Sequence, residues 1–301
     1  MSKRVTPAIE RFNKKNKGKT FKQYTPGQEA WMRMTKNKLA IVGLVVVILL
    51  ILLAIFASVI APAGYDVQDY SQILKSPSWE HIFGTDDFGR DIFVRLLYGS
   101  RISIPVGFIC SAVSLLIGGG LGLVAAYYGG LVEDIIMRIM DIFQAIPAML
   151  FAMAVLSAIG TGVANMIIAI TISCLPLFAR ITRGAVYTVK GADYMDASRA
   201  IGAGSVRMML KHILPNALGP IIVVTTFSVA GNILVVSALS YLGVGIVPPT
   251  AEWGSILSAA KSYISAAPWY LIFPGVTIMI AVFALNLFGD GVRDALDPRL
   301  K

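Results

Sequence analysis

Five long stretches of the chain contain no charged residue, and they constrain the fold more than any other feature. They cover residues 39–61, 102–128, 142–179, 213–251 and 262–289. About 20 apolar residues suffice for a helix to cross a bilayer. The stretch 142–179 is long enough for two crossings, and the segment SAIGTGVAN within it supplies a turn. The sequence therefore predicts an all-α membrane protein with six spans, at about 39–61, 102–126, 136–158, 164–182, 217–239 and 269–289.

The few charges that remain predict the orientation of these spans. Only 14% of the 301 residues are charged, whereas a soluble domain has about 25%. Residues 1–38 hold eleven basic and two acidic residues, residues 62–101 hold four and six, and residues 180–211 hold six and two. Because cytoplasmic loops are enriched in Lys and Arg, we expect both termini and the 180–211 loop to be cytoplasmic. The net charge of +9 then reflects topology and contact with anionic lipid, and requires no nucleic-acid partner.

The first span is predicted to be an uncleaved anchor. The tripeptide APA follows it at residues 61–63, but the apolar run is too long and its leading segment too extended for a signal peptide. Before the span, Thr25, Pro26 and Gln28 are typical of a capping box with proline at the first helical position. We expect an elbow helix there, with Trp31 at the membrane interface.

No motif indicates catalysis or a metal site. Cys110 and Cys174 lie singly inside spans and are interpreted as small apolar filler. The segment GKT at residues 18–20 lacks the upstream glycine of a phosphate-binding loop. Arg138 and Asp141 are three residues apart near one end of a span, so we expect a structural ion pair rather than a proton path. Uphill transport would need energy from outside this chain.

The polar segment YMDASRAIGAGSVRMMLKHILPN, at residues 194–216, separates the fourth and fifth spans. Asp193 is expected to cap a short helix that begins at Tyr194 and ends at Gly202 and Gly204. Ser205 is expected to cap a second helix, which runs into the membrane until Pro215 disturbs it.

The first of these short helices presents Tyr194, Ala197 and Ile201 on one side. A short helix tied at both ends to spans could fit a partner's groove and move both spans with it. An ordinary amphipathic loop on the membrane surface explains the composition equally well, and the residues alone leave both interpretations open.

The segment before the second span is expected to form an interfacial helix on the external side. Asp91 and Arg95 are four residues apart with the acid first, the favourable order for a helical ion pair, and Gly84 with Thr85 suits a turn and a cap. A solvated, salt-bridged helix without a partner is the alternative. Further along, PPTAEWG at residues 248–254 predicts a surface or re-entrant hairpin, and IGGGLGL at 117–123 predicts close helix packing.

Several motifs resemble a known family. DASRAIG at 196–202, followed by Leu214 and Pro215, resembles the loop signature of ABC importer permeases, with Asp196 in place of a glutamate and Ser198 in place of an alanine. Four further segments are similar to the second permease of dipeptide, oligopeptide and nickel importers. These are HIFGTDDFGRDIFVRLLYGSRIS (81–103), RIMDIFQAIP (138–147), SYLGVGIVPPTAEWGSIL (240–257) and NLFGDGVRDALDPRLK (286–301). Their order and spacing make the resemblance specific.

The resemblance implies a type I ABC importer permease fold in a bacterial or archaeal cell membrane. Its units would be a cytoplasmic tail and elbow helix (1–38), a first span (39–61), an external segment (62–100), a five-helix core (101–290) with a coupling loop at about 183–212, and a cytoplasmic tail (291–301). The implied partners are a homologous second permease, two cytoplasmic ATPase subunits that bind ATP and Mg, and an external substrate-binding protein. This chain would hold no cofactor and no catalytic residue.

The resemblance also assigns candidate site residues. Those expected to contact the ATPase are Tyr194, Asp196, Ala197, Ser198, Ile201, Gly202, Leu214 and Pro215. Those of the external segment are Gly84, Thr85, Asp86, Gly89, Arg90, Asp91 and Arg95. Peptides are the expected cargo, with nickel or another small solute as the alternative. A stand-alone carrier or channel is the rival of another class.

Overall fold

The computed structural model describes residues 26–200 and 202–296, and it is built from helices that could cross a membrane. Five continuous helical segments are long and apolar enough, and a bent helix pair makes a sixth if it counts as one span. The five segments are α3 (Lys38–Ile60), Ile92–Tyr128, α8 (Val163–Lys190), Ser205–Tyr241 and α13 (Pro268–Leu296). The expected all-α membrane fold is confirmed. Residues 1–25, Ile201 and residues 297–301, which include Thr25 of the expected capping box and the GKT segment, lie outside the described residues.

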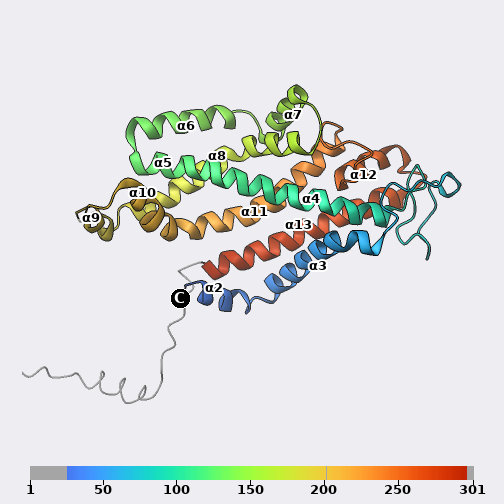
Figure 1. The fold of residues 1–301 in the computed structure, drawn as a ribbon, viewed down its shortest axis with the longest axis horizontal. Coiled ribbons are helices and arrows are strands. Elements are labelled where there is room, and N and C mark those ends of the chain that lie inside the picture. Colours follow the sequence, from blue (N-terminus) through green and yellow to red (C-terminus); the bar gives the residue numbers. More distant parts are fainter. Residues whose placement is uncertain (1–25, 201, 297–301) are drawn as a thin grey trace, which may run out of the picture.

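Figure 1 shows an elongated bundle with α6 along one edge and α3 along the opposite edge. One end carries the short helix α9 (Asp193–Ala200), and the other carries α12 (Trp253–Ala259) with the loop that joins α3 to α4. We call these the α9 end and the α12 end. The elbow helix α2 (Pro26–Met34) packs against α13 through Met34, which is buried with Ala40 and Ala295.

The second span begins ten residues earlier than the sequence indicated. α4 (Ile92–Ser114) continues through a π-helical turn (Leu115–Gly119) into α5 (Gly120–Tyr128). Ile92, Leu96 and Leu97 are buried. The expectation of a separate interfacial helix before the second span is therefore wrong, because the helix that begins at Ile92 continues into the span and its apolar residues pack against α12 and α13.

The segment that was expected to form the third span is a bent pair of helices. α6 (Gly130–Gln144) and α7 (Ala148–Ile159) meet at an angle of 83°, and Pro147 stands immediately before α7. The expected ion pair on this span is also wrong. Asp141 pairs instead with Arg180 of α8, because α6 lies along α8 and brings a guanidinium from another helix to the carboxylate.

We call residues 191–204, which contain α9, the α9 loop. The fifth span starts directly after this loop. α10 (Ser205–Arg207), a π-helical turn (Met208–Ile213) and α11 (Leu214–Tyr241) form one continuous segment. Gly204, not Ser205, is the N-cap, and no side chain caps this helix. Pro215 does not end the segment, which passes through the π-helical turn just before the proline and continues as α11.

Glycines bring the central helices into close contact. A Cβ atom on Gly122 would lie 2.2 Å from the carbonyl oxygen of Ala179, and one on Gly118 would lie 2.6 Å from that of Leu175. The expected close packing of the 117–123 segment is therefore confirmed, with α8 as the neighbour. α11 contributes to the buried clusters that join it to α4, α8 and α13.

Candidate functional site

The α9 loop projects from one end of the bundle (Figure 1). α9 begins at Asp193, directly after α8 and the short turn at Gly191. Tyr194, Asp196 and Ala197 are exposed on α9. Ser198 is half-buried, and its hydroxyl donates to the carbonyl of Tyr194 at 2.8 Å. These four candidate residues thus lie together on a short projecting helix, while the fifth, Ile201, lies outside the described residues.

One residue that the sequence interpretation overlooked attaches this helix to the bundle. Met195 is fully buried, in a cluster with Leu123 of α5, Val186 of α8 and Met208. Met195 is the one long aliphatic side chain in the sequence of α9, and that isolated apolar position was the available signal. α9 therefore presents one face outward while the other is held by three elements of the bundle.

Gly202 ends α9 with a positive φ of +82°. Among residues 26–200 and 202–296, no atom lies within 4 Å of a Cβ built there, so the backbone conformation, not space, requires glycine. The two remaining candidates, Leu214 and Pro215, lie apart from α9 at the start of α11. Leu214 is half-buried against Ala185 and Val189 of α8, and Pro215 is exposed.

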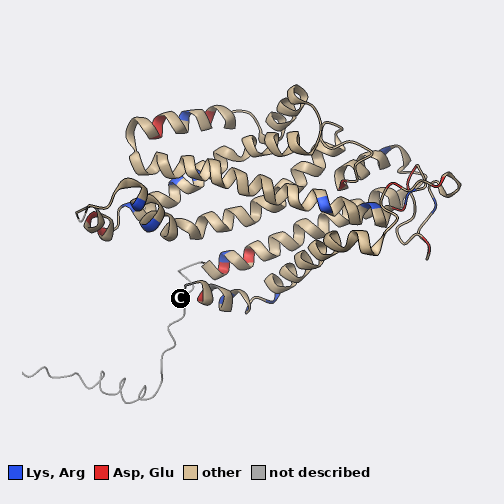
Figure 2. Ribbon diagram, in the orientation of Figure 1, with Lys and Arg blue, Asp and Glu red and all other residues tan. Residues whose placement is uncertain are grey.

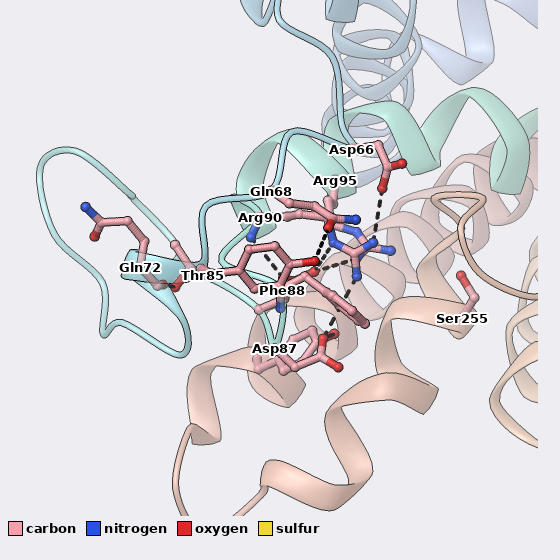
Figure 3. A network of polar contacts seen from close by, with 12 residues as sticks. Asp66, Gln68, Gln72, Thr85, Asp87, Phe88, Arg90, Arg95 and Ser255 are labelled. Carbon is pink, nitrogen blue, oxygen red and sulfur yellow. Dashed lines mark hydrogen bonds and ion pairs between the residues drawn. The ribbon is translucent and has the colours of Figure 1, made fainter.

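At the α12 end, the external segment contains a network of polar contacts that includes Asp66, Arg90 and Arg95 (Figure 3), and a buried carboxylate joins the two arginines. Asp86 is fully buried. Its Oδ2 accepts from Nε of Arg90 at 2.7 Å and from Nη1 of Arg95, and its Oδ1 accepts from the backbone N–H groups of Phe88 and Arg90. Both carboxylate oxygens of Asp86 thus accept hydrogen bonds, which is the condition under which a buried charge is tolerated.

Arg90 extends this network outward. It also contacts Asp66 at 3.1 Å and Asp87 at 3.9 Å, and Tyr270 of α13 donates to Asp87 at 3.0 Å. Burial alone would lower the pKa of the Arg90 guanidinium, but the charge of Asp86 and the hydrogen bonds to Asp86 and Asp66 outweigh it, and the pKa is raised. The network therefore joins the start of the external loop, its end, and α13.

Asp91 does not pair with Arg95 as the four-residue spacing indicated. Its Oδ1 accepts from the N–H of Val94 and caps α4, while its Oδ2 contacts Nδ1 of His81 at 2.8 Å. Arg95 points to Asp86 instead. The helix begins at Ile92, so Asp91 is its N-cap rather than a residue on its face.

Two glycines and a threonine determine the backbone conformation of the external segment. Gly84 and Gly89 have φ values of +74° and +72°, and a Cβ on Gly89 would lie 1.8 Å from the carbonyl oxygen of Asp69. The Thr85 hydroxyl accepts from the N–H of Lys75 at 2.8 Å and donates to the carbonyl of Gln72. All seven candidate residues of this segment therefore take part in one ordered structure.

A second buried carboxylate at the α12 end was overlooked. Glu252 caps α12 by accepting from the N–H groups of Gly254 and Ser255, and Ser103 of α4 donates to it at 3.1 Å. The adjacent Trp253 is fully buried and donates to the carbonyl of Leu96 at 3.0 Å. The second half of the PPTAEWG segment, residues 251–254, is thus buried against α4 and α11, whereas Pro248 and Pro249 are exposed. Among the described residues, no three His, Cys, Asp or Glu side chains are placed to hold a metal ion.

Comparison of the sequence with known proteins shows which family the chain is similar to. Residues 118–301 match the family described as binding-protein-dependent transport system inner membrane component, and residues 25–77 match the N-terminal TM domain of oligopeptide transport permease C. The chain is 45% identical to a dipeptide transport system permease protein of Alkalihalophilus pseudofirmus, over 93% of each chain. It is 42% identical to a glutathione transport system permease protein of Escherichia coli, over 92% of each chain.

The fold also resembles a solved transporter. An inward-facing structure of the MetNI methionine ABC transporter superposes with a TM-score of 0.58 and 20% identity, over 68% of this chain and 98% of the other. The chain therefore has the fold of an ABC transporter permease and belongs to the family of binding-protein-dependent transport system inner membrane components.

Proposed function

We propose that this chain forms half of the translocation pathway of an ATP-driven importer for di- or oligopeptides. The observation that carries the proposal is its similarity, over nearly the whole chain, to permeases named for dipeptides and for glutathione, which is itself a tripeptide. The remaining subunits would be a homologous second permease, two ATPases that bind ATP and Mg, and an external binding protein that delivers the peptide. This chain would be a non-catalytic subunit.

The α9 loop would couple the ATPases to the pathway. Tyr194, Asp196 and Ala197 face outward, so a groove on a cytoplasmic ATPase can hold α9 without disturbing the packing of Met195. The segment Ser205–Tyr241 is continuous, and its 37 residues span about 55 Å at about 1.5 Å per residue. A displacement of α9 would therefore be transmitted along α11 to the α12 end.

In this mechanism ATP binding closes the two ATPases and moves the α9 helices of both permeases. α8 and α11 follow, and the cavity between the permeases opens toward the binding protein. Hydrolysis and release return it to the inward-facing state. The α9 end would be cytoplasmic, and the α12 end would face the binding protein.

Reconstitution tests the proposal. The chain, expressed with its genomic neighbours, should co-purify with a second permease and two ATPases. In proteoliposomes, uptake of a labelled dipeptide should require ATP on the side of the ATPases and the binding protein on the other side. Uptake by this chain alone, without ATP, would establish a carrier or channel instead. ATP-dependent uptake of nickel but not of peptides would overturn the peptide assignment alone.

A further inference from the structure

A half-buried guanidinium lies between α3 and α4 without a counter-ion. Arg101 is on α4, nine residues after its start at Ile92. Its Nε donates to the carbonyl of Ala54 at 2.6 Å, and its Nη2 donates to the carbonyl of Ile55 at 2.9 Å and to the hydroxyl of Ser58 at 3.1 Å. All three acceptors are uncharged oxygens of α3. In the part of the chain that the structure describes, no carboxylate forms an ion pair with Arg101.

The depth of this guanidinium in the membrane follows from α3. Its 23 residues span about 35 Å, slightly more than a hydrocarbon core of about 30 Å. The carbonyls of Ala54 and Ile55 are about 8 Å before the end of this helix, which lies at the α12 end (Figure 1). The guanidinium of Arg101 is therefore just inside the hydrocarbon boundary at that end. An ionised group at this depth requires polar or oppositely charged neighbours.

The contacts with α3 fix one edge of the guanidinium and leave the other edge available. Nη1 has two N–H groups, and it has no hydrogen-bond partner among residues 26–200 and 202–296. The ring of Tyr98 lies 5.0 Å from the guanidinium carbon, and its hydroxyl donates to the carbonyl of Ala61, directly after α3. The planar donor fork of arginine matches the geometry of a phosphate group. The Nη1 edge is therefore suited to bind a phosphate.

An open pocket of about 360 Å³ lies beside the guanidinium, between α3 and α4. Its walls include Ile51 and Ile55 of α3, and Ile104 and Pro105 of α4. Ile55 and Pro105 are exposed, so the pocket opens to the outside of the bundle. A cation beside an apolar wall fits an anion that carries a hydrocarbon chain.

The surface around the pocket indicates that this anion is a lipid. α3 exposes Val45, Leu52 and Val59 and has no charged residue after Lys38, and Figure 2 shows it without charges beyond its start. An acidic side chain from another protein would have to enter the hydrocarbon region to reach Arg101, which is costly. The phosphate of a phospholipid already lies at the boundary of that region.

We infer that Arg101 and this pocket form a site for one anionic phospholipid in the leaflet at the α12 end. The Nη1 edge of Arg101 binds the phosphate, and one acyl chain lies against Ile51, Ile55 and Ile104. The bound lipid supplies the charge that the guanidinium lacks and fills the gap between α3 and α4. The inference requires only that these two helices cross a membrane, and it does not depend on the cargo or on a second permease.

Native mass spectrometry tests the inference on the protein and its co-purifying subunits, taken from nanodiscs with equal amounts of phosphatidylglycerol and phosphatidylcholine. The wild type should retain phosphatidylglycerol in preference to phosphatidylcholine during delipidation. Arg101→Gln removes the charge and should lower this retention several-fold. Equal retention of the two lipids by the wild type, unchanged retention by Arg101→Gln, or displacement of the lipid by inorganic phosphate would overturn the inference.

A second variant leaves Arg101 and its contacts with α3 in place. Ile55→Trp fills the pocket and should also lower the retention of phosphatidylglycerol several-fold. Leu52→Trp is the matched control and should retain the lipid, because Leu52 is exposed on α3 but is not part of the pocket wall. Retention at the wild-type level by Ile55→Trp would contradict the site even if Arg101→Gln fails to assemble.

Discussion

At the scale of single residues, two glycines of the α9 loop differ in their backbone conformation. Gly202 has a φ of +82°, whereas Gly204, two residues later, has an ordinary φ of −68°. In the part of the chain that the structure describes, no atom lies within 4 Å of a Cβ on either glycine. The two positions therefore differ in the backbone conformation that they require and not in packing within this chain.

Gly202→Val should abolish peptide uptake and peptide-stimulated ATP hydrolysis, because a β-branched residue in the left-handed region costs more than about 1 kcal/mol and displaces the end of α9. Gly204→Val is the matched control and should retain both activities. Uptake and ATPase rates in proteoliposomes measure the effect. Equal activity of the two variants would mean that the shape of this loop does not control coupling.

The buried network at the α12 end gives a second prediction at this scale. Arg95→Met leaves Asp86 with one of its two guanidinium partners and should destabilise the chain by about 3–5 kcal/mol, because a buried carboxylate loses compensation. Asp66→Asn removes a half-exposed partner of Arg90 and should cost less than about 1 kcal/mol. Thermal unfolding of the purified complex compares them, and a similar shift for both variants would contradict the central role of Asp86.

At the scale of secondary-structure elements, α9 is too short to be stable alone and depends on one anchor. Helices shorter than about 12 residues are marginal in water, and α9 has eight residues. The buried side chain of Met195 holds it against α5 and α8. The orientation of the exposed face therefore depends on a residue that faces the opposite way.

Met195→Ala should uncouple transport from ATP hydrolysis, since the cavity costs about 2–5 kcal/mol and releases α9 from the bundle. Met195→Leu nearly conserves volume and should remain active. Hydrogen exchange at residues 191–204 should rise in the alanine variant while basal ATP hydrolysis continues. Wild-type exchange together with lost transport would point to a direct partner contact at Met195 instead of an anchor.

The pair between Arg180 and Asp141 joins α8 to α6, and we predict that its role is structural. Asp141→Asn should reduce assembly modestly, because each partner is about half exposed in the isolated chain. It should leave the pH dependence of peptide uptake unchanged. Assembly yield and uptake between pH 5.5 and pH 8 are the measurements, about the range where a proton-coupled step would appear. Normal assembly with altered pH dependence would favour a proton path.

At the scale of the whole molecule, the two ends of the bundle have different chemistry. The α9 end has a small projecting helix, while the α12 end has an ordered loop held by buried charge (Figures 1 and 3). Trp79 in this loop is fully exposed. This asymmetry is suited to a chain that contacts different partners at its two ends.

Cysteine labelling tests which end faces the cytoplasm. In a variant with Cys110 and Cys174 replaced by alanine, Trp79→Cys should react with an impermeant maleimide in intact cells. Ala197→Cys, also at an exposed position, should react only after permeabilisation. Labelling of Ala197→Cys in intact cells would reverse the orientation and exclude α9 as a cytoplasmic coupling helix.

The sequence by itself determined that this chain is an all-α membrane protein, because its uncharged stretches have the length of bilayer-crossing helices, in which the backbone groups hydrogen-bond within the segment. It also determined the position of the α9 loop, since polar residues and glycines interrupt the apolar pattern there.

Only the tertiary structure decided the partners of the charges. Spacing along one helix indicated Asp91 with Arg95 and Arg138 with Asp141, yet Arg95 bonds Asp86 and Asp141 bonds Arg180. Local spacing predicts only contacts within a helix. The packing of α6 on α8, and of the external loop on α4, brought better placed groups together across the fold. The anchoring of Met195 and the burial of Glu252 depend on the same long-range packing, which no local pattern records.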